Sequence, residues 1–170
     1  MNTSTKTLPL LILVVSSATS SAFAACNSAL PNQASSRYSA SNGVVTDNKT
    51  SLMWQQCSLG QTYSSGSCSG TATRLTWTVA TSQASAASDF GFSDWRLPDR
   101  KELESLVDLA CASPAINAEI FPATAAVRYW SSSPYLSGDS LLWSLNFYDG
   151  QVFAQAGTET AAVRLVRSLP

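Results

Sequence analysis

The chain has 170 residues, with 10 Lys or Arg, 11 Asp or Glu and no His, which gives a formal net charge of −1. Nucleic acids and anionic membrane surfaces favour a basic excess, so this balance excludes both as expected partners. Because the chain lacks histidine, the commonest general acid–base arrangements and histidine metal sites are also excluded.

Residues 1–24 have the pattern of an export signal. Lys6 supplies a positive start, residues 8–15 form an apolar core, and Ala22-Phe23-Ala24 offers a cleavage site of the A-x-A kind. The apolar core is shorter than the about 20 residues that span a bilayer, and no second hydrophobic segment follows, so we expect no membrane span. We expect cleavage after Ala24. A lipoprotein, modified at Cys26, is the alternative, although Phe23 fits its signal poorly.

The four cysteines indicate an oxidising compartment, because disulfides persist mainly in exported proteins. Four cysteines allow three pairings. We favour Cys57–Cys68, because it closes a short flexible loop, and Cys26–Cys111, because the remaining two cysteines then tie the N-terminal tail to the end of a helix. A metal site is the alternative, and the absence of both Cys-x-x-Cys spacing and histidine argues against it.

The beginning of the mature chain predicts a tail followed by a hairpin. Residues 25–40 are polar and are expected to be a tail tied down by a disulfide, and the domain itself is expected over residues 41–170. Residues 43–46 and 52–55 are β-prone and flank the turn-forming residues 47–50, which indicates a β-hairpin.

Two helices are predicted in the middle of the chain. Thr76 is expected to cap a helix from Trp77 to about Ser88, whose small and aromatic residues recur on one face. Asp99 and Glu102 have the spacing of a capping box, in which each side chain accepts from the other residue's amide. A second helix is therefore expected from Arg100 to about Ala110.

After Pro122 the pattern changes to short strands. Four are expected, at residues 128–132, 141–147, 151–155 and 163–167. The segment 146–150 ends in Asp-Gly, a turn signal that joins two of them into a hairpin. Strands, then two helices, then strands again is an α+β order.

Five motifs, in this order and spacing, resemble the Lcl C-terminal domain family over residues 37–167. They are residues 45–54, 91–103, 129–135, 146–150 and 163–167. The resemblance implies a C-type-lectin-like fold, with two helices packed on short antiparallel strands and stapled by disulfides. It also implies a secreted or surface domain that binds sulfated glycosaminoglycans and assembles as a trimer.

The sequence argues against catalysis. The carboxylate pairs Asp89/Asp94 and Glu102/Glu104 are expected to cap helices and to lie at the surface, since nothing in their spacing places them across a cleft. Formylglycine-generating enzymes share the broad fold class, but their chemistry needs cysteines late in the chain, and none follows Cys111. We therefore expect no enzyme.

The tryptophans divide into two expected groups. Trp54, Trp77 and Trp95 are expected to face the core. Trp130 and Trp143 alternate with small polar residues in predicted strands, and both are expected to be half-buried.

Turn-rich segments near the predicted C-terminal strands hold the candidate ligand-binding residues. These are Tyr135, Asp139, Asn146, Tyr148 and Asp149. Aromatic rings stack on the apolar faces of sugars, and Asn and Asp pair with their hydroxyls. The calcium motifs of sugar-binding lectins are absent, so no cofactor is expected, and calcium stays possible without a motif to support it.

Arg128 and Arg167 are the candidates for binding a sulfated ligand, because a guanidinium matches sulfate with paired donors. Arg164 is expected to be structural. The alternation of Arg164 and Arg167 can instead place one of them in a buried ion pair with Asp94 or Asp108.

Two functions remain open. The first is an exported adhesion or recognition module for sulfated or other surface glycans, located in the periplasm, at the cell surface or outside the cell. The second is a structural or protein-interaction subunit of a surface assembly. The slightly acidic net charge favours the second.

Overall fold

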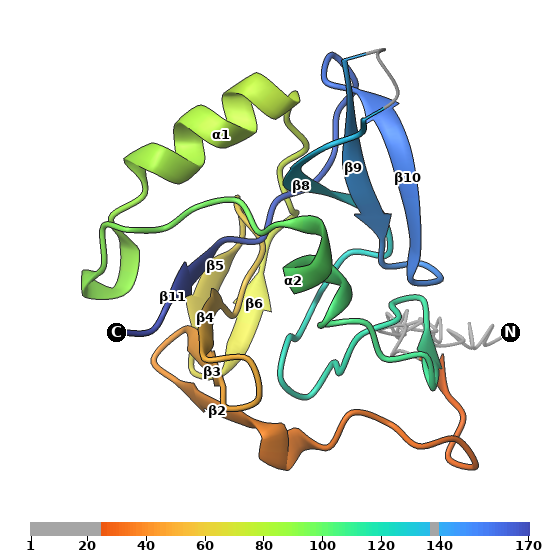
Figure 1. Ribbon diagram of the computed structural model, residues 1–170. Helices are drawn as coiled ribbons and strands as arrows, with labels where there is room; N and C mark the ends of the chain where they lie inside the picture. Colours follow the sequence, from red (N-terminus) through yellow and green to blue (C-terminus); the bar gives the residue numbers. More distant parts are fainter. Residues whose placement is uncertain (1–24, 137–139) are drawn as a thin grey trace, which may run out of the picture.

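The computed structural model describes residues 25–136 and 140–170, and its largest sheet has four antiparallel strands in the order β11-β4-β3-β2 (Figure 1). The strands are β2 Tyr38–Ser41, β3 Val44–Asp47, β4 Leu52–Gln55 and β11 Val166–Ser168. The predicted hairpin is confirmed as β3–β4.

The sequence does not predict β2, because only Tyr38 of its four residues is buried. The expected domain boundary at residue 40 therefore falls inside a strand.

A second antiparallel sheet has the order β10-β9-β8. Its strands are β8 Arg128–Pro134, β9 Leu141–Asn146 and β10 Gln151–Ala156, which confirms the predicted hairpin over residues 146–150. Two further sheets have two strands each: β1 Ala25–Cys26 with β7 Cys111–Ala112, and β5 Thr62–Ser64 with β6 Ser67–Ser69. Mostly short strands with two helices make the fold α+β, as predicted.

The helices are α1 Trp77–Ala86 and α2 Arg100–Glu104. The capping box is confirmed, because the amide of Glu102 donates to the Asp99 carboxylate and the amide of Asp99 donates to the Glu102 carboxylate. Thr76, by contrast, makes no side-chain capping bond, so that prediction is wrong.

The expected extension of α2 to Ala110 is also wrong. Val107 pairs with Ile116 in an isolated β-bridge, and the amide of Asp108 donates to the carbonyl of Ala115. Leu103 and Leu106 are still buried, so the apolar stripe reaches the core without a longer helix. Contacts with a distant segment thus outweigh the local helical pattern.

Residues 161–166 run through the centre of the molecule, and all six are buried. Ala162 and Val166 belong to a core cluster that lies with β4, α2 and β9, while Val163 and Leu165 belong to a second cluster with α1 and Trp95. The alternation is that of an extended chain whose two faces both contact the core. Ala161 and Ala162 form isolated bridges with Leu75 and Tyr129, and only Val166 of this segment belongs to β11, so the predicted start of that strand at residue 163 is too early.

Two disulfides join Cys26 to Cys111 and Cys57 to Cys68, the pairing favoured from the sequence. The tail is also bound through Gln33. Its side-chain amide donates to the carbonyls of Ser105, at 3.0 Å, and Val107, at 2.6 Å. The tail therefore docks against the segment that follows α2.

Within residues 25–136 and 140–170, no helix is long and apolar enough to cross a membrane. Residues 1–24, the expected export signal, lie outside the described residues.

Candidate functional site

A groove of about 690 Å³ lies between the start of α1 and the adjoining ends of β8, β9 and β10. Trp77 and Tyr135 line it together with Leu142 and Thr158. Gly157 permits this close approach, because a Cβ there would lie 3.1 Å from Leu142 Cδ1 and 3.6 Å from Trp77 Cβ. Its lining combines exposed ring surface with the hydroxyl groups of Thr76, Thr78, Ser140 and Thr158.

Trp77 is fixed in this groove at both its backbone and its side chain. Its amide donates to the carbonyl of Gly157 at 3.0 Å, and its indole Nε1 donates to the carbonyl of Ser131 at 2.9 Å. Trp77 packs against the second core cluster, as predicted, but it is only half-buried because it also lines the groove. A ring held in this way loses little freedom when a ligand packs against it.

A second hollow, of about 340 Å³, lies at the start of α2 and is lined by Arg100, Lys101, Ser133 and Trp143. The Arg100 guanidinium lies 4.4 Å from the centre of the Trp143 ring, and Arg100 Nε donates to Glu104 Oε1 at 2.8 Å. The amide of Arg100 donates to Ser133 Oγ at 3.0 Å. This start of α2 is thus attached to β8 and stacked on β9.

The rings of Tyr135 and Trp143 join the two hollows. Their centres lie 4.8 Å apart, edge to face at 84°. Five residues therefore form one surface, called the aromatic–basic groove below: Trp77, Arg100, Lys101, Tyr135 and Trp143. It offers apolar ring faces beside two cations, of which Lys101 is exposed.

Of the predicted ligand-binding residues that the structure describes, only Tyr135 lies in this groove. Asn146, Tyr148 and Asp149 lie at the other end of β9, five residues of strand away from Leu141. At about 3.4 Å per residue this is about 17 Å, so one small ligand cannot contact both ends. Asp139 lies outside the described residues.

The polar residues of the β9–β10 turn mainly stabilise the turn itself. Asn146 Oδ1 accepts from the amide of Tyr148 at 3.0 Å, and Asp149 Oδ1 accepts from the amide of Gln151 at 3.1 Å. Such local bonds are the usual role of Asn and Asp in turns. Tyr148 is exposed beside them.

The two arginines predicted to bind sulfate do not form one exposed basic patch. The side chain of Arg167 is only 12% exposed, donates to Asp94 Oδ1 at 2.7 Å and lies over the Phe92 ring. Its bond lowers the pKa of Asp94 below the ordinary value. Arg128 lies near Glu159 instead, at 3.6 Å, and donates to Gln155. Arg167 is thus already bound by the protein.

Arg164 is structural, as expected, but its partners differ from the prediction. It donates to the carbonyls of Gln55 and Gln56 and to Thr124 Oγ1, and within the described residues no carboxylate lies within ion-pair distance. The side chain lies over the Phe121 ring and is completely buried. Asp108 instead accepts from the amide of Gln33.

Sequence reasoning missed Arg100, Lys101 and Trp143 as site residues. Two adjacent cations, Arg100 and Lys101, directly follow the capping residue Asp99, and this pair was a usable signal for an anion-binding surface. From the sequence they were interpreted only as helix residues. The stacking of Arg100 on Trp143 depends on tertiary packing. Trp130 was expected to be half-buried and is fully buried, because its Nε1 donates to the carbonyl of Leu75 in the core.

Among the residues that the structure describes, no group of three or more Cys, Asp or Glu side chains could hold a metal ion. A search of curated proteins found no match to this chain. The family model of the Lcl C-terminal domain matches residues 43–167, which is most of the chain and contains the capping box, the tryptophans and the whole aromatic–basic groove. The chain therefore belongs to the Lcl C-terminal domain family.

Proposed function

We propose that this protein is an exported, non-catalytic recognition domain with a C-type-lectin-like architecture, and that it binds glycans in the aromatic–basic groove. The observation that carries the proposal is the contact of Arg100 with Trp143 beside Tyr135. Binding sites for small ligands combine apolar surface with a few placed polar groups, and this groove has both. The two disulfides support export, because such bonds persist in oxidising compartments.

The charge of the groove favours glycans that carry sulfate or carboxylate groups. Arg100 and Lys101 are adjacent cations at the start of α2 that can pair with such groups, in a hollow that Asp99 also lines and where Glu104 pairs with Arg100. A sugar ring can lie against Trp77 or Tyr135 while its anionic group reaches Arg100 or Lys101. The proposed site needs neither a cofactor nor a metal.

A protein-interaction subunit remains the second candidate, and one observation favours it. Leu109 and Tyr148 are large apolar side chains that are 77% and 56% exposed. They lie near each other, because a Cβ at Gly150 would lie 3.5 Å from Leu109 and Tyr148 is two residues away in the turn. Exposed apolar groups that gather in this way are typical of protein contacts.

Heparin chromatography and a glycan array, each with and without calcium, test the glycan proposal. We expect the mature protein to be retained at low salt, and the double variant Arg100→Gln/Lys101→Gln to elute at clearly lower salt, since exposed charge contacts are screened by ions. Trp143→Ala should reduce array binding as well.

The matched control is Lys49→Gln/Arg74→Gln, which removes two exposed cations outside the groove. An equal loss in this control would mean that net charge, and not the groove, drives retention. If the unmodified protein binds no glycan on the array or column, the glycan proposal fails and the protein-interaction candidate stands.

A further inference from the structure

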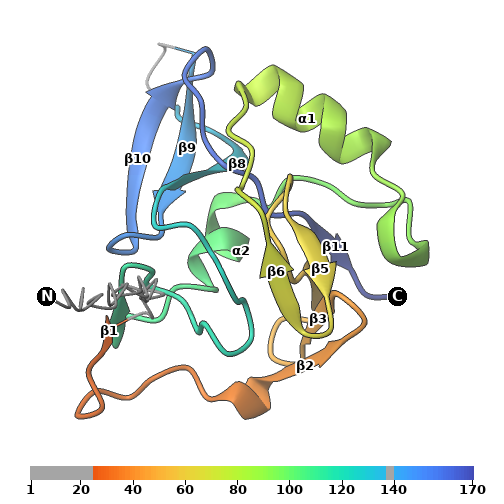
Figure 2. The same ribbon diagram turned by 180° about the vertical axis from the view of Figure 1, so that it is seen from behind.

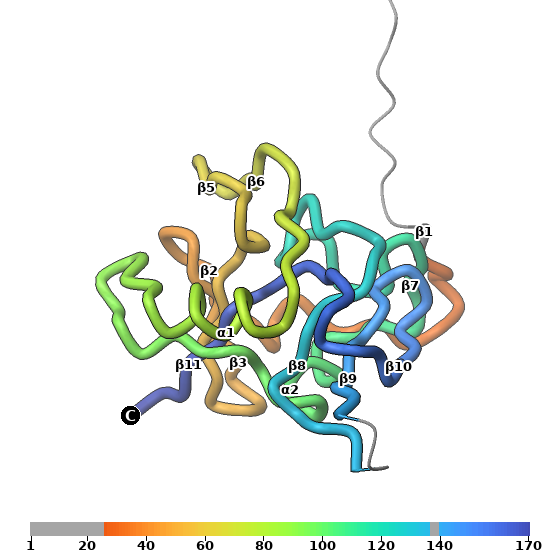
Figure 3. Tube along the Cα trace, turned by 90° about the horizontal axis from the view of Figure 1, so that it is seen from above, coloured from red at the N-terminus to blue at the C-terminus, as the bar shows by residue number. Residues whose placement is uncertain are grey.

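A smaller pocket of about 240 Å³, separate from the aromatic–basic groove, lies beside the Cys57–Cys68 disulfide. Its lining includes Gln55, Gln61, Tyr63, Asp89 and Phe90. The β5–β6 hairpin that carries Tyr63 lies apart from the β8–β9–β10 sheet both from behind (Figure 2) and from above (Figure 3). The pocket shares no lining residue with the aromatic–basic groove, so it is a separate feature of the surface.

Phe90 occupies this pocket in an unfavourable backbone conformation. Its φ is +57°, in the left-handed region that a bulky side chain rarely adopts, and the side chain is 41% exposed. Such strain persists only where surrounding structure enforces it, and it concentrates at functional sites. Because the Phe90 ring is partly exposed, its burial contributes little to stability. Stability alone therefore does not explain why a phenylalanine stands at this strained position.

The surrounding structure holds the Phe90 ring in place. A Cβ at Gly43 would lie 2.3 Å from a carbon of that ring, so the ring occupies space that only glycine leaves. The Tyr63 ring meets it edge to face, with centres 6.3 Å apart. The rings of Phe90 and Tyr63 together form one side of the pocket, called the aromatic wall below, and this side is open to solvent.

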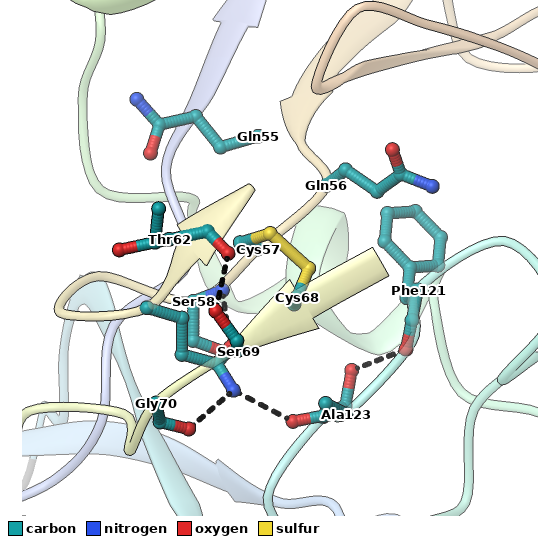
Figure 4. The surroundings of a disulfide bond; sticks show 12 residues. Gln55, Gln56, Cys57, Ser58, Thr62, Cys68, Ser69, Gly70, Phe121 and Ala123 are labelled. Atoms are coloured by element: carbon teal, nitrogen blue, oxygen red, sulfur yellow. Dashed lines mark hydrogen bonds between the residues drawn. A yellow bond between two sulfur atoms is a disulfide. The ribbon is translucent and has the colours of Figure 1, made fainter. Parts of the chain in front are cut away.

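Polar groups stand beside this wall in a fixed arrangement. Gln55 is only 6% exposed, and its Nε2 donates to Asp89 Oδ2 at 3.1 Å. Within the described residues, Gln55 Oε1, Asp89 Oδ1 and the Tyr63 hydroxyl have no hydrogen-bond partner. In Figure 4 the side chains of Gln55 and Gln56 extend in opposite directions, so Gln55 points away from the core around Phe121.

The floor of the pocket is rigid. Gln61 Oε1 accepts from the amide of Ser58 at 2.9 Å, and its Nε2 donates to the carbonyl of Ala123 at 3.0 Å. The Cys57–Cys68 disulfide connects the same segment to β6. A site whose groups are fixed beforehand loses less entropy on binding.

We propose that this pocket binds one neutral sugar unit, with an apolar face of the sugar ring against Phe90 and its hydroxyls donating to Gln55 Oε1 and Asp89. The free groups at the pocket are mainly acceptors, which suit hydroxyl donors. No cation lines the pocket and Asp89 is a carboxylate, so sulfated or carboxylated sugars are repelled. This assignment is independent of the aromatic–basic groove.

The test is a titration of the isotope-labelled mature protein, followed by NMR, with methyl α-mannopyranoside, methyl β-galactopyranoside and N-acetylglucosamine. At least one sugar should shift the resonances of Gln55, Tyr63 and Phe90 while those of Trp143 stay unchanged. Phe90→Gly should weaken this binding about tenfold or more. Its melting temperature should stay the same or rise, because glycine adopts positive φ without strain.

Val79→Ala is the matched control, since Val79 is 42% exposed on α1 and lies outside the pocket, and it should bind as the unmodified protein does. Asp89→Ala provides a second variant if Phe90→Gly fails to fold, and it should lose binding likewise. The proposal is overturned if no sugar shifts these resonances, if tetramethylammonium does so in place of the sugars, or if both variants bind normally. Loss of heparin retention alone leaves it unaffected, because that result concerns the other site.

Discussion

Beneath the Cys57–Cys68 disulfide the guanidinium of Arg164 is completely buried, whereas that of Arg100 stands at the rim of the aromatic–basic groove over Trp143. Arg164 is bound by backbone carbonyls and hydroxyls, and among the residues that the structure describes it has no carboxylate partner and its Nε has no partner at all. Burial lowers the pKa of Arg164 below the ordinary value. Arg100, by contrast, pairs with Glu104 at the surface.

The difference teaches what each region requires of an arginine. In the core, four hydrogen bonds from the two terminal nitrogens of Arg164 tie together segments that are far apart in the sequence, around Gln55 and Thr124. At the rim, a surface ion pair is worth little stability, so the guanidinium remains available to a ligand. The same residue type thus stabilises one region and, in the function proposed above, contacts the ligand in the other.

The largest effect is expected at Arg164. Arg164→Ala should lower the free energy of unfolding by about 3–5 kcal/mol, because it leaves a cavity and buried acceptors without donors. Arg100→Ala, the control at the rim, should cost less than about 1 kcal/mol. Urea unfolding of both variants measures the difference. If both variants lost a similar free energy of unfolding, the two arginines would not differ in their contribution to stability.

A half-buried arginine that does have a carboxylate sharpens the comparison, because Arg37 pairs with the buried Asp47. Burial by itself would raise the pKa of Asp47, but hydrogen bonds from Arg37, Thr50 and the Lys49 amide outweigh it and lower the pKa. The stability from this pair is therefore complete above the ordinary carboxyl pKa of about 4 and is lost as pH falls through the lower folded-state value.

Asp47→Asn should lower the free energy of unfolding at pH 7 by about 1.5–3 kcal/mol, since it weakens hydrogen bonds to a charged group. It should also flatten the loss of stability between about pH 5 and pH 2. Chemical unfolding across this pH range measures both effects. An unchanged acid slope in the variant would show that another group, such as Glu102, whose pKa is also lowered, governs acid unfolding.

A smaller effect is expected at the start of α2, which positions Arg100. Asp99→Ala removes one half of the capping box and should cost about 0.5–2 kcal/mol. Thermal melting and heparin retention should be measured on the same variant. A loss of retention with no change in melting temperature would mean that Asp99 contacts the ligand and is not simply a cap.

Local sequence signals predicted the parts of the fold that depend on neighbouring residues. The capping box of Asp99 and Glu102 is confirmed because both bonds lie within four residues. The β3–β4 and β9–β10 hairpins form where turn-forming residues separate β-prone runs. The cysteine spacing favoured the observed disulfide pairing for a similar reason, since a short loop closes easily.

Elements fixed by distant contacts were predicted less well. The helical pattern after Glu104 gave way to the bridge between Val107 and Ile116, and the sequence left open which of Arg164 and Arg167 pairs with an aspartate, which the structure decides as Arg167 with Asp94. Both outcomes depend on which segment of the chain packs against these residues, and the local sequence pattern does not indicate that segment. The same holds for the groove at Trp77, which packs against the second core cluster as its periodicity predicts but also lines a groove that the periodicity does not predict.

The sequence by itself determined the α+β order, the capping box of Asp99 and Glu102, the hairpins, the cysteine pairing and, through its motifs, the family. Only the tertiary structure decided which arginines are enclosed, and which aromatic rings meet cations. Secondary structure follows from the backbone preferences and spacing of adjacent residues. A binding surface, in contrast, is assembled from separate strands and helices, so Arg100 and Trp143 become neighbours only when α2 packs on β9.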